Sequence, residues 1–189
     1  MIQSILNLIL KRKHLIILLF ICVFSRIISS IFYFEDIDSL RFALSASKFS
    51  ILESRPHFPG YAVYCFILQT INKFIANIGL SFSIIGGLSI FITTLYAIKI
   101  HNIYTHFNTL PLAIILFINP IMWLMSNRYM PDILGLALLV AGTYYFIKIL
   151  KNKQRKDYII FGAILGLEAG VRLSFMPFFI PAFFLVFNK

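Results

Sequence analysis

Hydrophobic residues occur along this chain in long runs that short polar stretches interrupt, a pattern typical of membrane-spanning helices. Four of the runs are each predicted to form one span: residues 15–34, 82–100, 110–125 and 133–150. A fifth run, 158–187, is long for a single span and contains Arg172, Pro177 and Pro181. We expect it to form two short helices that meet near Arg172.

The longest polar interruption, residues 35–60, directly follows the first span. It opens with Glu35, Asp36 and Asp38, which are three of the seven acidic residues in the whole chain. Carboxylates are costly at a membrane boundary, so this clustering indicates a functional site. The same acids could instead cap a helix that begins at Ser39.

Within this loop, the apolar side chains of Phe42, Ala46 and Phe49 share one face of a helix predicted over 39–53. Such an amphipathic helix is expected to lie along the membrane surface. Two prolines and a glycine between positions 55 and 60 then end the helix and turn the chain into the next segment.

Basic clusters set the predicted orientation across the membrane. One cluster, Lys11 to Lys13, precedes the first span, and the densest cluster lies between 148 and 156. Cytoplasmic loops carry an excess of Lys and Arg, so both clusters and the N-terminus are placed in the cytoplasm. The loop 35–60 and the stretch from Asn127 to Asp132 then face outside, beyond the plasma membrane if the protein is bacterial.

An even number of crossings must join these two external loops, although three apolar segments lie between them. The weakest segment is 61–79, since it carries Gln69, Asn72 and Lys73, which are costly in hydrocarbon. We expect this segment to be re-entrant or interfacial rather than a full crossing.

Composition supports a membrane protein, because 60% of the residues are hydrophobic, 13% are charged and the mean hydropathy is +0.89. The prediction is an all-α, polytopic integral membrane protein that forms a single transmembrane domain over 1–189. The net charge of +10 comes from clusters beside apolar runs, where Lys and Arg meet anionic lipid, so no nucleic-acid partner is expected. Cys22 and Cys65 lie inside apolar runs and the four histidines are scattered, so neither disulfides nor a metal site are predicted.

A second charged group lies in the last apolar run. Glu168 and Arg172 are four residues apart and can pair across one helical turn, which would be a structural role. By the same count of crossings, Arg172 returns to the outer side, level with Asp38 and Asp132. There its cation could hold a lipid phosphate.

Four motifs resemble one known family. Asp38-Ser-Leu-Arg41-Phe-Ala is similar to the acidic motif in the first external loop of the GT-C glycosyltransferases, integral membrane enzymes that use polyprenyl-phosphate sugars. His57-Phe-Pro-Gly-Tyr-Ala-Val-Tyr64 resembles the His-Pro-Pro-Gly-Tyr-Pro-Leu-Tyr motif of the protein O-mannosyltransferase-like branch, with two prolines replaced. Asn127-Arg-Tyr-Met-Pro-Asp132 and Gly170-Val-Arg-Leu-Ser174 are similar to the second acidic site and the basic segment that follows it.

The resemblance implies the N-terminal catalytic half of a protein O-mannosyltransferase-like or aminoarabinose transferase-like enzyme, since family members are usually longer. Asp38 is then the expected general base, which takes the proton of the acceptor, and Asp36 is the alternative. Asp132 is expected to orient the acceptor or a neighbouring base. A Pro-Asp pair is also an ordinary helix start, so Asp132 has a purely structural alternative.

Substrate binding is assigned to the polar groups around these acids. The predicted binding residues are Glu35, Arg41, Arg55, His57, Arg128 and Arg172. Arg128 and Arg172 are expected to contact phosphate, while Arg55 and His57 line the entrance for the lipid headgroup. Glu35 would hydrogen-bond the substrate or, if a divalent cation binds, ligate that cation. No other cofactor is implied.

The predicted reaction is sugar transfer from a polyprenyl-phosphate donor to a lipid, glycan or protein acceptor at the external membrane face. The expected partners are the lipid-linked sugar donor, membrane lipids, and a C-terminal half or partner subunit. Two alternatives stay open. One is a transporter or flippase-like protein for a lipid-linked substrate, and the other is a non-catalytic, truncated glycosyltransferase-like subunit.

Overall fold

The structure is a computed structural model that describes residues 2–105 and 108–187. Side chains are described from residue 13 onward, except at 183, 186 and 187, so the side chains of the predicted basic cluster at Lys11 and Arg12 lie outside this description. Every regular element in the described part is a helix, which confirms the all-α prediction.

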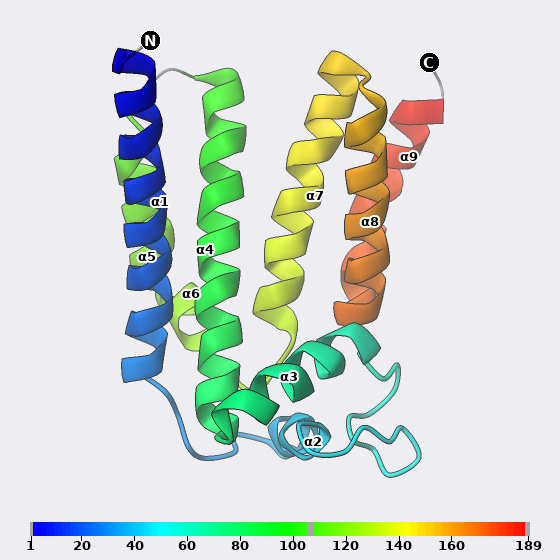
Figure 1. Ribbon diagram of the computed structural model, residues 1–189. Coiled ribbons are helices and arrows are strands. Elements are labelled where there is room, and N and C mark those ends of the chain that lie inside the picture. The colour runs from blue at the N-terminus through cyan, green and yellow to red at the C-terminus, as the bar shows by residue number, and fades with distance from the viewer. Residues whose placement is uncertain (1, 106–107, 188–189) are drawn as a thin grey trace.

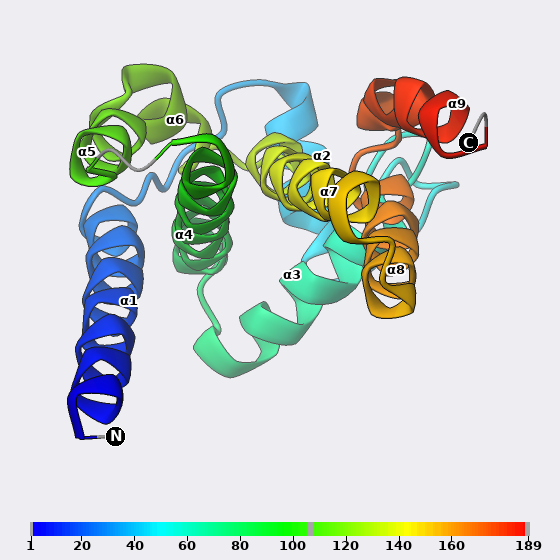
Figure 2. The same cartoon turned by 90° about the horizontal axis from the view of Figure 1, so that it is seen from above.

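Ten helical segments follow one another along the described chain. They are α1 (Ile2–Ile28), α2 (Ile37–Ser45), α3 (Ala62–Ile75), α4 (Ile78–Tyr104), α5 (Leu110–Ile118), α6 (Pro120–Met125), α7 (Asp132–Asn152), α8 (Arg155–Val171), the 3-10 helix η1 (Leu173–Phe179) and α9 (Ile180–Phe187). Helices α1, α4, α7 and α8 stand side by side in a row, with α2 and α3 across one end (Figure 1). Figure 2 shows α5, α6 and α9 on one side of this row and α3 on the other.

The two ends of the row carry different charges. Glu35 in the loop before α2, Asp38 in the first turn of α2 and Asp132 at the start of α7 lie at the end of the row that α2 and α3 cover, and we call this the acidic end. The end of α4, with Lys99, and the turn between α7 and α8, within 148–156, lie at the opposite end, which we call the basic end (Figure 1). The start of α1 also lies at the basic end.

Two helices in the described residues, α4 and α7, are long and apolar enough to cross a membrane. They extend past the predicted spans 82–100 and 133–150 at both ends. Helix α1 instead ends at Ile28, short of the predicted limit at residue 34. The hydroxyls of Ser29 and Ser30 bond back to carbonyls in its last turn and compete with the helical backbone bonds.

Hydrophobicity predicts one continuous helix over 110–125, but the structure divides this run into two helices. Pro120 lacks the amide hydrogen that a continuous helix would use. The side-chain oxygen of Asn119 accepts hydrogen bonds from the amides of Ile121 and Met122 at 3.0 and 3.1 Å. Asn119 therefore caps a new helix, α6, and the run is divided between α5 and α6.

The surface helix is shorter than the predicted 39–53, because α2 ends at Ser45. A turn follows in which Ser50 and Arg55 exchange two backbone hydrogen bonds of 2.9 and 2.8 Å. These bonds use the backbone groups that a longer helix would need, so the second half of the prediction is wrong.

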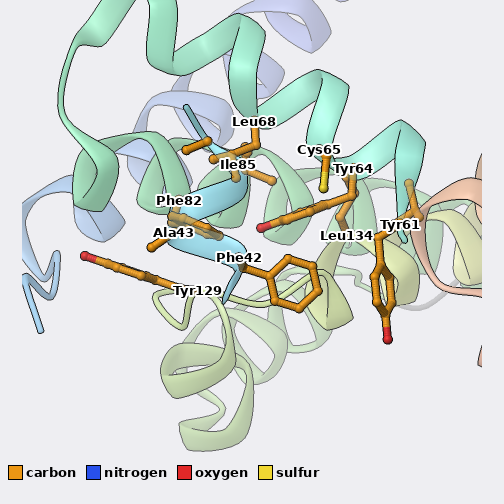
Figure 3. Close-up of a cluster of buried hydrophobic side chains, with 12 residues drawn as sticks. Phe42, Ala43, Tyr61, Tyr64, Cys65, Leu68, Phe82, Ile85, Tyr129 and Leu134 are labelled. Atoms are coloured by element: carbon orange, nitrogen blue, oxygen red, sulfur yellow. The ribbon is translucent and has the colours of Figure 1, made fainter. Parts of the chain in front are cut away.

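An aromatic core joins α2, α3 and α4 at the acidic end (Figure 3). Phe42 of α2 is fully buried and meets the rings of Tyr61 and Tyr64 edge-on, with centroids 5.0 and 5.8 Å away. Phe82 of α4 stacks on Tyr129 at 4.4 Å. Burying one such ring contributes about 1.5–3 kcal/mol. The hydroxyls of Tyr129 and Tyr64 donate to carbonyls in the loops before α2 and α7, so the core also fixes those loops.

The loop before α7 is held by a close approach to α4 and α1. A Cβ atom on Gly86 would lie 1.7 Å from the carbonyl oxygen of Ser126, so only glycine fits there. Arg26 of α1 is fully buried, donates to the hydroxyl of Ser126 and lies 3.8 Å from the centroid of a Trp123 ring. These contacts place the segment that leads into Asp132.

Candidate functional site

Asp36 sets the position of α2. Its Oδ1 accepts hydrogen bonds from the amide of Ser39 at 2.7 Å and from the hydroxyl of Ser39 at 2.8 Å. These bonds, the amide first, lower the pKa of the Asp36 carboxyl. Asp36 thus has the capping role that the sequence had left open, and Asp38 stands in the first turn of the helix that it caps.

Arg128 joins the loop before α7 to the loop before α2. Its Nη2 lies 2.7 Å from Oδ2 of Asp36, and its Nε donates to Glu35. The hydrogen bond to Glu35 is the main cause that raises the pKa of Arg128. Arg128 therefore forms one ion-pair cluster with two predicted site residues that lie more than 90 positions before it in sequence.

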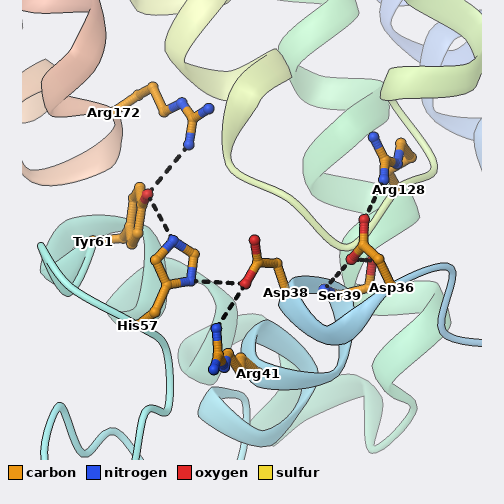
Figure 4. Close-up of polar contacts among 8 residues, drawn as sticks. All are labelled: Asp36, Asp38, Ser39, Arg41, His57, Tyr61, Arg128 and Arg172. Carbon is orange, nitrogen blue, oxygen red and sulfur yellow. Dashed lines mark hydrogen bonds and ion pairs between the residues drawn. The ribbon is translucent and has the colours of Figure 1, made fainter.

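Asp38 presents one bound and one unbound carboxylate oxygen (Figure 4). Arg41 donates to Oδ1 at 3.1 Å, and Nδ1 of His57 lies 3.3 Å from the same oxygen, an ion-pair contact when the imidazole is protonated. Oδ2 has no partner among the described residues and points away from Arg41 and His57 in Figure 4. The Asp38 side chain is 38% exposed, and Oδ2 is not among the buried polar atoms that lack a partner, so this oxygen reaches the surface.

Tyr61 and Arg172 extend this network to Asp132. The hydroxyl of Tyr61 lies 3.2 Å from Nε2 of His57, and Nη1 of Arg172 donates to the same hydroxyl at 3.3 Å (Figure 4). Nη2 of Arg172 lies 2.7 Å from Oδ1 of Asp132. Asp38, His57, Tyr61, Arg172 and Asp132 thus form one connected chain of side chains.

Arg55 and Glu168 have other surroundings. Nε of Arg55 lies 3.2 Å from a carboxylate oxygen of Glu53, in the turn that follows α2. The predicted pair between Glu168 and Arg172 is wrong, because Arg172 leaves helical geometry at the end of α8, with φ −150° and ψ 83°, and reaches Asp132. Both carboxylate oxygens of Glu168 are buried and have no hydrogen-bond partner among the described residues.

Two pockets flank the ion pair between Arg172 and Asp132. The first has a volume of about 410 Å³ and is lined by Phe58, Pro59, Tyr61, Arg172, Leu173 and Ser174. The second has a volume of about 230 Å³ and is lined by Asp132 and the apolar residues Ile121, Met122, Met125, Ile133, Leu136 and Phe175. A cation therefore borders one pocket, and a carboxylate borders a mainly apolar one.

No three His, Cys, Asp or Glu side chains gather as a metal site among the residues that the structure describes. Glu35, the predicted ligand of a divalent cation, forms an ion pair with Arg128. Binding of a cation by Glu35 stays a prediction. Sequence reasoning missed Tyr61, although it lies inside the motif from His57 to Tyr64. The available signal was a phenol four residues after His57 in a polar loop.

Comparison of the chain with protein-family models, with curated proteins and with solved structures finds no match. The likeness to GT-C glycosyltransferases therefore rests on the four short motifs that carry it.

Proposed function

We propose that the chain is an integral membrane glycosyltransferase that moves a sugar from a polyprenyl-phosphate donor to a hydroxyl group of a lipid, glycan or protein. One observation carries the proposal: the accessible Oδ2 of Asp38 and the cationic Arg172 belong to one network at the end of an apolar helical row. A carboxylate and a cation are the two groups that such a transfer needs.

The membrane part of this proposal rests on exposed apolar surface as well as on α4 and α7. Along α1, Ile16, Phe20 and Ile28 are 65%, 63% and 70% exposed. Such a continuous apolar face is unfavourable in water and suits lipid tails. We propose a multi-pass arrangement in which α1, α4, the broken pair α5 and α6, α7 and α8 cross the bilayer, since α4 ends at the basic end and α7 begins at the acidic end. The acidic end then faces outward and the basic end faces the cytoplasm, in keeping with the positive-inside rule.

The transfer itself needs one proton acceptor and one stabilised leaving group. The acceptor hydroxyl gives its proton to Oδ2 of Asp38 while its oxygen bonds to the anomeric carbon of the sugar. The bond from that carbon to the phosphate oxygen breaks, and the phosphate leaves with the electron pair. Arg172 borders the 410 Å³ pocket, so a phosphate seated there meets its guanidinium.

His57 and Asp132 have supporting roles in this scheme. His57 contacts Oδ1 of Asp38 and so orients the base with its other oxygen free. Asp132 borders the apolar pocket, where its carboxylate can orient an acceptor hydroxyl beside apolar groups. Asp36 and Glu35 hold the loop through Arg128, which leaves Asp38 as the accessible base.

Sugar release from a panel of polyprenyl-phosphate sugars by the purified chain tests the proposal. Asp38→Asn should lower turnover by about 10²–10⁴-fold, the usual contribution of a general base. The matched control is Lys48→Gln, which removes a charge from an exposed pair with Glu53. Unchanged turnover in Asp38→Asn would remove the assignment of the base. No turnover by any folded variant would favour the non-catalytic subunit.

A transporter or flippase-like protein is the second candidate, and two observations favour it. The break between α5 and α6 at Asn119 interrupts an apolar helix, and both Arg26 and Glu168 are fully buried ionisable residues. Broken helices and buried charges are common in transporters. Movement of a fluorescent lipid-linked sugar across liposomes, with no sugar released, would support this candidate against the transferase.

A further inference from the structure

Ion pairing differs between the two ends of the helical row. At the acidic end, five basic side chains lie in ion pairs with carboxylates: Arg41, Lys48, Arg55, Arg128 and Arg172. At the basic end, Lys148 pairs with the buried Asp157 at 2.7 Å. Lys99, Lys151, Lys153, Arg155 and Lys156 have no carboxylate partner among the described residues. The basic end therefore has positive charge that its own side chains do not balance.

Two of these lysines are held in defined positions between α4 and α7. Nζ of Lys99, on α4, lies 4.3 Å from the ring centroid of Tyr96 and 5.5 Å from that of Tyr144, on α7. Nζ of Lys151, on α7, lies 4.8 Å from the ring centroid of Tyr104, on α4. Each helix thus places a cation over a ring of the other helix. Cation–π contacts localise an ammonium group without neutralising its charge.

Lys148 lies beside the same Tyr144 ring, but its charge is offset by a carboxylate. Its Nζ lies 5.9 Å from the ring centroid of Tyr144 and 2.7 Å from Oδ1 of Asp157. Asp157 is the one carboxylate in the described part of this end, so it offsets a single lysine. Lys99 and Lys151 remain as two positioned, uncompensated cations, Lys151 in the last turn of α7 and Lys99 in the turn before the last turn of α4.

We propose that this cluster, made of Lys99, Lys148, Lys151, Tyr96, Tyr104 and Tyr144, binds the phosphate headgroup of an anionic phospholipid in the cytoplasmic leaflet. The inference rests on the membrane arrangement of the proposed function. Tyrosine rings suit the boundary between hydrocarbon and headgroups, and ammonium groups donate to phosphate oxygens. Basic pockets between helices on the cytoplasmic side are where such lipids are recognised.

The headgroup site has to be distinguished from two simpler effects. Lysines in the last turn of a helix also interact with its negative end, whatever lipid surrounds them. In addition, a basic surface attracts anionic lipid through its total charge, without a defined site. The first effect acts in neutral lipid, and the second depends equally on Lys153 and Lys156.

The test is thermal unfolding of the full chain in nanodiscs of phosphatidylcholine, alone or with part of it replaced by phosphatidylglycerol. With the headgroup at about ten times its dissociation constant, binding should raise the Tm of the wild type by about 3–6 °C. Lys99→Gln/Lys151→Gln should lose most of this rise. The matched control Lys153→Gln/Lys156→Gln, which removes the same charge from the same end, should keep it.

Three results would overturn the site. Equal loss in both double variants would mean attraction by total charge. A full rise in Lys99→Gln/Lys151→Gln would mean that the cluster is not involved. An equal rise of the wild type with soluble glycerol phosphate in neutral nanodiscs would assign the contact to a free phosphate compound. Asp38→Asn should keep the full rise, so failure of the transferase proposal leaves this result distinguishable.

Discussion

Replacing Asp36 separates two contacts that hold the candidate site together. Asp36→Asn keeps a side-chain oxygen that can accept from the amide of Ser39 but removes the charge that faces Arg128. Asp36→Ala removes both contacts. Loss of an N-cap costs about 1 kcal/mol, with a range of about 0.5–2 kcal/mol. The pair with Arg128 is partly exposed, 40% for Asp36, so its loss costs about 0.2–1 kcal/mol.

These free energies predict a measurable difference in Tm between the two variants. For a chain of this size, 1 kcal/mol shifts Tm by about 2–4 °C, so Asp36→Ala should lower Tm by about 3–6 °C and Asp36→Asn by about 1–3 °C. A thiol-reactive fluorophore can report unfolding in detergent, since Cys22 and Cys65 are both buried free thiols. Glu53→Gln, which alters two solvent-exposed ion pairs, with Lys48 and with Arg55, is the control and should change Tm by less than about 2 °C.

The pH dependence gives a second check on the same contacts. The pKa of Asp36 is lower in the folded chain than its usual value of about 3.9. Its charge therefore stabilises the fold fully above pH of about 4, and this contribution is lost as pH falls through the folded pKa. The Tm difference between wild type and Asp36→Asn should be constant from neutral pH down to about pH 5 and shrink below about pH 4.

The result that would refute this reasoning is a loss in Asp36→Asn as large as that in Asp36→Ala. In that case the charge contact with Arg128, and not the cap, would hold α2. No change in either variant would show that neither contact limits the stability of this region.

Three further substitutions test the packing of the helical row. Gly86→Ala should lower Tm by more than about 4 °C, because its Cβ would lie 1.7 Å from the carbonyl oxygen of Ser126. Gly162→Ala should raise Tm by about 2–4 °C, because alanine favours a helix more than glycine does and no atom lies within 4 Å of its Cβ. A rise in both variants would show that α4 and the loop at Ser126 separate readily. Glu168→Leu should raise Tm, because it removes two buried oxygens that have no partner, and a fall of several degrees would reveal a partner for this carboxyl.

Much of the candidate site could be predicted from short polar motifs in an apolar chain. Asp38 and Arg172 stand out as charges in an apolar chain, whereas the roles predicted for His57 and Asp132 follow from the motifs that resemble GT-C enzymes. The structure brings these four residues into one network. Their function remains a proposal, but their proximity follows from a physical rule: charges in apolar chains are costly unless they meet partners or water.

Contacts that depend on backbone geometry could not be predicted in the same way. Hydrophobicity made 110–125 look continuous, whereas one Asn-Pro step ends α5 and starts α6. The predicted helix over 39–53 was inferred from apolar spacing, but spacing carries no information about the backbone pairing of Ser50 with Arg55. A periodic pattern indicates which face could be buried, not where the helix stops.

Arg172 shows the same limit at the centre of the site. A spacing of four places Glu168 and Arg172 together only if the helix continues through both residues. Here α8 ends at Val171, so the Arg172 side chain leaves the helix surface and binds Asp132, 40 positions earlier in the chain. Because the helix ends there, the Arg172 guanidinium does not contact the buried carboxyl of Glu168 and instead lines the 410 Å³ pocket. The end of one helix therefore decides whether Arg172 pairs with Glu168 or lies beside Asp132 at the edge of this pocket.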